Sequence, residues 1–228
     1  MSSLGAISKQ QKLMASWCGR PIDEHGLVRI LNENGTRPPL LWIFNAANGP
    51  KKLAEALGND QPLIFTRSTH LMVQPGEDPA EPQRELADHF LHQVALNFPG
   101  TKFDFGTSCQ GTGIVMHFCA ELSGVNIDVG ALCMINCSMA QEITNRPAML
   151  VYGDNDRKQD PFESDFLNSE RRANTMFSTY RRLVVPARHG TYFSKGVIEG
   201  ILAQFAAFKL SVDRDRVSSS AASSSDVG

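Results

Sequence analysis

The stretch KFDFGTSCQGTG, residues 102–113, constrains the fold of this chain more than any other feature. It has the pattern of a strand, then a tight turn, then the start of a helix. The turn has the form small-x-nucleophile-x-small, with Cys109 in the nucleophile position. A turn of this kind lifts one side chain into a sparsely allowed backbone conformation at the top of a sheet. The sequence therefore predicts a reactive thiol at Cys109.

The residues around this turn favour Cys109 over its neighbour Ser108. The positions that flank a nucleophile of this kind must be small, because the strand and the helix pass close together there. Thr107 and Gly111 meet that requirement for Cys109. If Ser108 were the nucleophile, one flanking residue would be the bulky Gln110. A thiol nucleophile in turn suggests thioester chemistry.

Strand-like and helix-like segments alternate along the chain. The continuous apolar run at 40–45 is typical of a buried parallel strand, and apolar residues recur at helical spacing over 82–98. This alternation predicts a mostly parallel sheet with helices on both faces, and its chemistry should lie outside the carboxyl ends of the strands. The other predicted strands are 27–31, 62–66, 103–106, 129–135, 148–152 and 183–185, and the other helices are 11–17, 51–57, 112–122, 163–177 and 197–210.

Length and composition limit the class of protein. A chain of 228 residues with 42% hydrophobic and 20% charged residues suits one globular α/β domain. The net charge of −2 gives no reason to expect nucleic acid as a partner. The sequence has no apolar stretch long enough for a membrane helix and no secretory signal. Five cysteines without a CxxC pair favour reduced thiols in the cytoplasm over disulfides or a zinc site.

Three segments are predicted along the chain. Residues 1–25 are interpreted as an N-terminal extension, and 26–212 as the α/β domain. Residues 213–228 are rich in Ser, Asp and Ala and are predicted to be a disordered tail.

Chemically useful side chains follow three predicted strands, in the order nucleophile, acid, histidine. Cys109 follows 103–106, Asp156 follows 148–152, and His189 follows 183–185. This is the order of the α/β-hydrolase fold. The preceding strand, 129–135, is followed by no carboxylate, which favours Asp156 as the acid; Asp154 is the alternative.

Each of these residues has an expected role. The start of a helix at Cys109 should favour the thiolate, and His189 can take and return the thiol proton. Asp156 would accept a hydrogen bond from His189 and fix its tautomer. The backbone N–H groups of Gln110 and Ala46 are predicted to form the oxyanion hole. This chemistry requires no metal and no cofactor, and the other histidines (25, 70, 89, 92 and 117) are interpreted as structural.

Several segments together resemble a known family. They are PPLLWIFN at 38–45, LAEAL at 53–57, QPL at 61–63, SCQG at 108–111, the pair Tyr152-Gly153 and HGTYF at 189–193. They are similar to the thioesterase domains of nonribosomal peptide and polyketide synthases, over roughly residues 27–210. The family implies an α/β-hydrolase fold and acyl substrates held as thioesters on the phosphopantetheine arm of a carrier protein. Most members use Ser as the nucleophile in this tight turn, which is called the nucleophile elbow. A minority branch, which this chain resembles, uses Cys.

Two departures from the family bear on function. Thr107 stands where the family usually has Gly, and only about eleven residues, 137–147, occupy the place of the usual helical lid. A reduced or absent lid predicts an open site. The resemblance implies release of the acyl group by hydrolysis. Transfer of an acyl or aminoacyl group between carrier proteins is the alternative, and a non-catalytic binding protein of the same fold is the third hypothesis.

Overall fold

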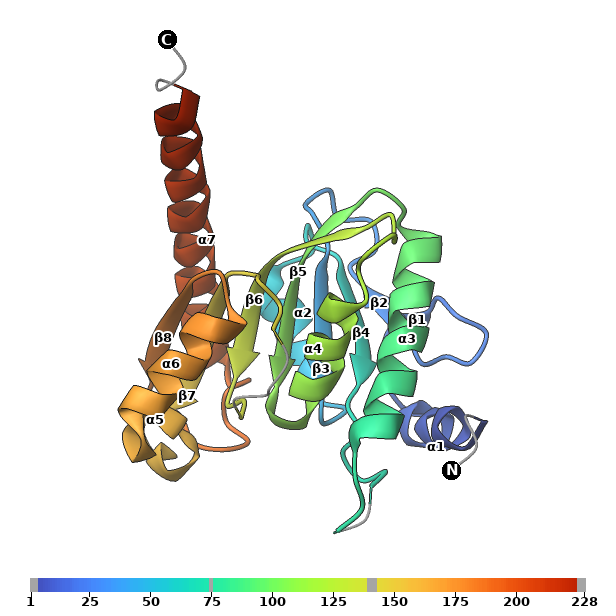
Figure 1. The fold of residues 1–228 in the computed structure, drawn as a ribbon. Helices are drawn as coiled ribbons and strands as arrows, with labels where there is room; N and C mark the ends of the chain where they lie inside the picture. Colours follow the sequence, from blue (N-terminus) through green and yellow to red (C-terminus); the bar gives the residue numbers. More distant parts are fainter. Residues whose placement is uncertain (1–3, 74–75, 139–142, 225–228) are drawn as a thin grey trace.

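An eight-stranded sheet forms the centre of the structure (Figure 1), with the strand order β1-β2-β4-β3-β5-β6-β7-β8. The computed structural model describes residues 4–73, 76–138 and 143–224. From β4 to β8 the neighbouring strands are parallel, while β1 and β2 are antiparallel additions at one edge. The strands are β1 (Arg20–Pro21), β2 (Arg29–Leu31), β3 (Leu40–Phe44), β4 (Leu63–Arg67), β5 (Lys102–Ser108), β6 (Asp128–Ile135), β7 (Ala148–Gly153) and β8 (Tyr180–Val185).

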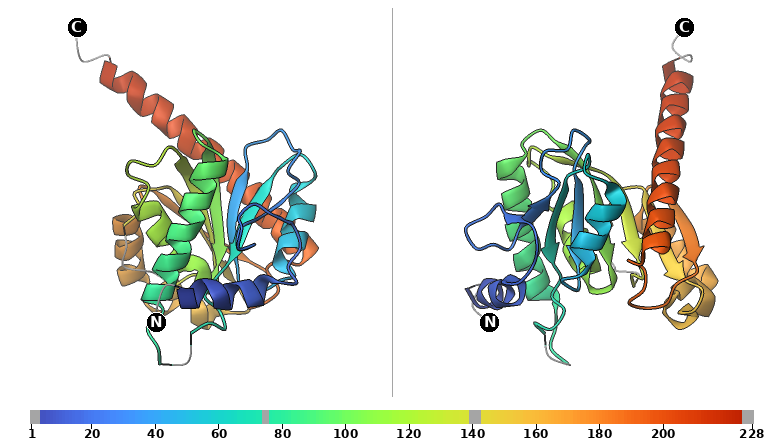
Figure 2. Two further views of the ribbon diagram at one scale, coloured as in Figure 1. Left: turned by 90° about the vertical axis from the view of Figure 1, so that its right-hand side faces the viewer. Right: turned by 180° about the vertical axis from the view of Figure 1, so that it is seen from behind.

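Helices cover both faces of this sheet. In Figures 1 and 2, α3, α4 and α6 lie over one face, and α2 and α7 lie over the other. This arrangement confirms the predicted α/β fold. The helices are α1 (Leu4–Met14), α2 (Gly49–Leu57), α3 (Ala80–Asn97), α4 (Thr112–Ala120), α5 (Pro161–Ser164), α6 (Phe166–Met176) and α7 (Lys195–Ser224), with short 3-10 turns η1 (Cys109–Gly111) and η2 (Arg157–Gln159).

The central strands are buried on both sides, which explains their continuous apolar sequences. Every residue of β3, β4 and β7 is buried. Because helices exclude water from both faces, these strands need apolar side chains at each position rather than at alternate ones. Below the carboxyl end of β3, the rings of Trp42, Phe44 and Phe193 pack together, with centroid separations of 5.5 to 6.0 Å.

The segment predicted as an N-terminal extension is part of the α/β unit. Met14 and Trp17 are buried in the main core, and β1 adds a strand to the sheet. The Gln10 side chain donates a hydrogen bond of 2.6 Å to the Arg67 carbonyl at the end of β4. Residues 4–25 therefore differ from the prediction, because apolar side chains in this polar segment complete the core.

The C-terminal segment also differs from the prediction. The tail was expected to be disordered from residue 213, but α7 continues as a helix to Ser224, and residues 225–228 lie outside the described part. A helix that is already nucleated gains one backbone hydrogen bond for each residue added, which allows a polar sequence to extend it. No helix in the described parts of the chain is long and apolar enough to cross a membrane.

The connection between β6 and β7 is short, as predicted. It consists of residues 136–147, and the described portions, 136–138 and 143–147, contain no helix.

We predict that Gly106→Ala destabilises the protein. Gly106 lies opposite Trp42 in the β5–β3 pairing, and a Cβ atom there would lie 2.1 Å from the indole ring. Because Trp42 is fully buried, the ring cannot move without displacing the core, so we expect a loss of about 1–3 kcal/mol or more. Urea unfolding measures this loss. The matched control is Gly200→Ala in α7, where a Cβ meets nothing within 4 Å and should stabilise the helix by about 0.5–1 kcal/mol.

Candidate active site

The elbow predicted from the sequence is present at Cys109. Ser108 has an extended backbone and ends β5, whereas Cys109 has a φ of +51° and begins η1, which leads into α4. A non-glycine residue in this left-handed region is uncommon and indicates a special local constraint. It is Cys109, not Ser108, that adopts the backbone conformation expected of a nucleophile at an elbow.

The close approach of β5 and η1 explains the small residues on either side of Cys109. A Cβ atom on Gly111 would lie 2.1 Å from Thr107 Oγ1 and 2.8 Å from Ile43 Cγ2. Any side chain at Gly111 would therefore force the turn open. Thr107 fills the remaining space, and its buried hydroxyl has no hydrogen-bond partner among the described residues.

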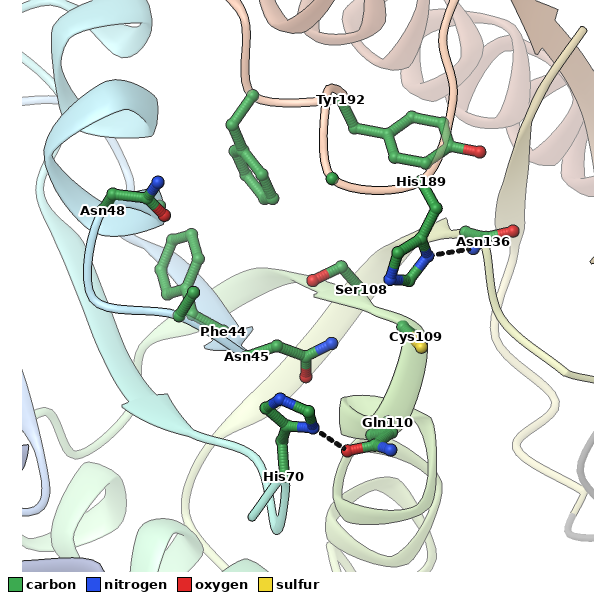
Figure 3. Close-up of a pocket in the computed structure, with 14 residues that line it drawn as sticks. Phe44, Asn45, Asn48, His70, Ser108, Cys109, Gln110, Asn136, His189 and Tyr192 are labelled. Carbon is green, nitrogen blue, oxygen red and sulfur yellow. Dashed lines mark hydrogen bonds between the residues drawn. The ribbon is translucent and has the colours of Figure 1, made fainter. Parts of the chain in front are cut away.

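His189 lies in the loop between β8 and α7, and its partner is an amide. His189 Nδ1 lies 3.1 Å from Nδ2 of Asn136, as Figure 3 shows, and Asn136 follows β6 directly. The same Asn136 nitrogen lies 2.5 Å from Gln159 Oε1. Asn136 is buried and has a φ of +50°, so its amide is held at a sharp backbone turn. An asparagine thus occupies the place where the sequence analysis looked for a carboxylate.

Neither aspartate predicted as the acid hydrogen-bonds His189 in the described part of the chain. Asp156 is half-buried, its charge acts on the Cys109 thiol, and its Oδ2 atom is buried without a hydrogen-bond partner among the described residues. Asp154, the alternative, is exposed and accepts a hydrogen bond of 2.7 Å from Asn155. Asn136 escapes prediction from the sequence because a carboxylate, not an amide, is the side chain expected to partner the histidine after β6.

A cavity of about 340 Å³ brings together four of the five predicted site residues, and Asp156 is not among its lining residues. Cys109, Gln110 and Ala46 line it with His189, as Figure 3 shows for the labelled members of this group. Its lining also includes side chains that the sequence analysis did not assign to the site, namely Phe44, Asn45, Asn48, His70, Ser108, Asn136, Tyr192 and Phe193. His70, interpreted as structural from the sequence, contributes directly, since its Nδ1 lies 2.8 Å from Gln110 Oε1.

The surroundings of Cys109 keep it as a neutral thiol. Burial raises its pKa, and the Asp156 charge raises it further, while the Gln110 backbone N–H and the Asn45 side chain lower it by hydrogen bonding. The helix N-terminus is expected from the sequence to favour the thiolate, but burial outweighs the hydrogen bonds here. Burial also raises the pKa of Tyr192 to about 12, so that this neighbouring phenol stays uncharged.

The sheet order and the elbow together define an α/β-hydrolase fold. No protein-family profile and no curated protein matches the chain. Among solved structures, it resembles the NocB thioesterase domain in a covalent complex with a fluorophosphonate nocardicin G analogue. The two share 12% identity at a TM-score of 0.63, over 80% of this chain and 99% of that one.

Other solved structures are similar in the same way. YbtT, a type II thioesterase from the yersiniabactin NRPS/PKS biosynthetic pathway, shares 13% identity at a TM-score of 0.53, over 84% of this chain and 95% of that one. The serine hydrolase CarC, involved in carbazole degradation, shares 10% identity at a TM-score of 0.58, over 86% of this chain and all of that one. These likenesses concern the fold, and they confirm the fold predicted from the resemblance to thioesterase domains.

We predict that alkylation of Cys109 by iodoacetamide continues to accelerate above about pH 8.5, the ordinary pKa of a thiol. Because burial raises the pKa of this thiol, the reactive thiolate is still a minor species at that pH and grows as the pH rises. Mass spectrometry of the peptide that carries Cys109 measures the rate. A rate that is already constant between about pH 7 and 9 would contradict the raised pKa.

Proposed function

We propose that this protein is a thioesterase that acts on acyl groups held on the phosphopantetheine arm of a carrier protein. The observation that carries the proposal is the position of Cys109, at an elbow with positive φ in the cavity that His189 also lines. The similarity in fold to the NocB and YbtT thioesterases supports a thioester as the substrate.

In the first half of the reaction, Cys109 takes the acyl group. Its sulfur attacks the carbonyl carbon of the thioester, a new C–S bond forms, and the bond to the pantetheine sulfur breaks. His189 accepts the thiol proton and passes it to the leaving sulfur. The N–H groups of Gln110 and Ala46, both beside the cavity, would hold the transient oxyanion.

In the second half, water releases the acid. His189 takes a proton from water, the hydroxide attacks the acyl carbon, and Cys109 leaves as a thiolate that regains its proton from His189. The short β6–β7 connection supports access of water to the acyl-enzyme, since its described residues form no helical cover.

Asn136 is proposed to orient His189 during both steps. For Nε2 to accept a proton, Nδ1 must carry one and donate it to an oxygen. The Asn136 amide can offer its oxygen to Nδ1 by turning through 180°, and the exposed Gln159 amide can turn with it. A Cys–His–Asn arrangement is a known variant of the catalytic triad.

Transfer to a second carrier thiol is the other candidate, and the thiol at Cys109 favours it. Exchange of one thioester for another is close to neutral in free energy, so a Cys109 acyl-enzyme can be loaded and unloaded reversibly. An incoming pantetheine thiol would attack the acyl carbon, and the bond to Cys109 would break. Hydrolysis and transfer share the same first step and differ only in the acceptor.

We expect an acyl-enzyme when the protein is mixed with an acyl-loaded carrier and a second, unloaded carrier. Intact mass spectrometry should show an acyl adduct on Cys109 and free acid in solution. Accumulation of the acylated second carrier instead would assign transfer. Cys109→Ala should abolish the adduct, because it removes the attacking sulfur. The matched control, Ser108→Ala, removes the neighbouring hydroxyl from the same cavity and should leave the adduct intact. Absence of any adduct on the wild-type protein would reject the proposal.

We predict that Asn136→Ala slows acyl-enzyme formation about 10- to 100-fold, since removal of a group that orients a catalytic imidazole has effects of this size in metal sites. Asn136→Asp should retain activity, because a carboxylate can also accept the Nδ1 proton. The paired variant Asp156→Ala tests the partner predicted from the sequence. A larger loss in Asp156→Ala than in Asn136→Ala would return the role to Asp156. Single-turnover acylation rates measure both.

A further inference from the structure

Asn45 directly follows β3 and lines the same cavity as the reactive Cys109. Its side chain lines the 340 Å³ cavity and lowers the pKa of the Cys109 thiol. Figure 3 shows the Asn45 amide beside Cys109, with its nitrogen on the side of the sulfur and its oxygen turned away. The sequence analysis assigned no role to this residue and expected only backbone groups in this loop.

A hydrogen-bond chain through Ser68 fixes which end of the amide faces Cys109. The His70 backbone N–H donates to Ser68 Oγ at 3.2 Å, and Ser68 Oγ donates to Asn45 Oδ1 at 2.7 Å. The Ser68 hydroxyl has one proton to give, and this proton is used on Asn45 Oδ1. The Asn45 amide oxygen is therefore satisfied, and its N–H₂ group is turned towards Cys109.

The position of Ser68 is itself well determined. Ser68 is fully buried, and its backbone N–H donates a hydrogen bond of 2.8 Å to the Phe44 carbonyl, which precedes Asn45. Its neighbour Arg67 is also buried and donates from its guanidinium to the His70 carbonyl. The loop after β4 thus holds the Ser68 hydroxyl in place against the end of β3.

We propose that Asn45 is a catalytic residue whose amide N–H₂ stabilises the Cys109 thiolate. The assignment rests on the proposed function only for its role in turnover, since the Asn45 amide is already oriented towards the sulfur in the free protein (Figure 3). An N–H donor favours the negatively charged sulfur over the neutral thiol, because hydrogen bonds to ionised groups are the stronger ones. Asn45 and the Gln110 backbone N–H together oppose the effect of burial on this sulfur.

This donor would act whenever Cys109 carries charge in the reaction. The sulfur is a thiolate when it attacks the substrate and again when the acyl group leaves it. Between these points it is an uncharged thioester sulfur and needs no donor. A donor that serves only the charged form lowers the barriers on both sides of the acyl-enzyme without stabilising the intermediate itself. A Cys109 thiolate that is a good leaving group suits an enzyme that must release or transfer its acyl group.

Alkylation of Cys109 with iodoacetamide across a range of pH tests this assignment without any thioester substrate. In Asn45→Ala we expect the apparent pKa of the thiol to rise by about one unit and the alkylation rate near neutral pH to fall about tenfold. Asn45→Asp keeps the oxygen that accepts from Ser68 but loses the N–H₂ group, and it should be at least as slow. Ser68→Ala leaves the Asn45 amide free to turn and should show a smaller loss.

The matched control is Asn48→Ala. Asn48 lines the same cavity but is exposed, and its side chain makes no cap hydrogen bond to α2. Its alkylation profile should equal that of the wild type. If Asn45→Ala and Asn45→Asp also alkylate like the wild type at every pH, the assignment to Asn45 is overturned.

Acylation by a loaded carrier separates this inference from the proposed function. If the wild type forms an acyl-enzyme, Asn45→Ala should slow both its formation and its decay, with the thermal unfolding temperature close to that of the wild type. If the wild type forms no acyl-enzyme but the alkylation profiles shift as expected, the thioesterase proposal fails and the thiolate donor stands. If the wild type forms an acyl-enzyme but the Asn45 variants alkylate like the wild type, the thioesterase proposal stands and the thiolate donor is rejected.

Discussion

The site depends on how closely β5 approaches the turn that follows it. A side chain at Gly111 would collide with Thr107, so the chain can reverse direction within η1 only because that position is bare. The reversal places Cys109 at a φ of +51° and directs its side chain into the cavity at the carboxyl ends of the strands. Strain at one residue is tolerated there because the fully buried β3 beside β5 leaves the strand no room to relax. The position of the nucleophile is thus set by packing in the core.

Amide side chains, rather than charged ones, lie around this thiol and the nearby imidazole. Asn45 faces the sulfur, Asn136 hydrogen-bonds His189, and Gln110 hydrogen-bonds His70 (Figure 3). A thiol loses its proton far more easily than a hydroxyl, so an imidazole without a hydrogen-bonded carboxylate can still serve it as a base. A neutral partner also avoids a second negative charge close to a thiolate, where Asp156 already acts against ionisation. Under the proposed function, the neutral amide partners therefore suit a thiol nucleophile better than they would suit a hydroxyl.

The strands, the elbow and the histidine loop could be predicted from the sequence because each leaves a local pattern. Apolar runs marked β3, β4 and β7, and the spacing of small residues marked Cys109. The partners of the site could not be predicted in this way. An asparagine after a strand is common in turns, and only the folded structure shows that Asn136 reaches His189 and that Asn45 faces Cys109 (Figure 3). The N-terminal segment and the end of α7 were missed because tertiary packing in one case and helix propagation in the other outweighed a polar composition.

The last helix, α7, carries the end of the described chain away from the active-site cavity. α7 begins at Lys195, shortly after His189, and runs for 30 residues, a length of about 45 Å at the usual helical rise. In Figure 1 it passes along the sheet and projects beyond the side opposite the carboxyl ends of the strands. A label, a surface anchor or a fused protein attached to its far end would be carried well clear of the cavity mouth, which leaves that mouth free to meet a large macromolecule.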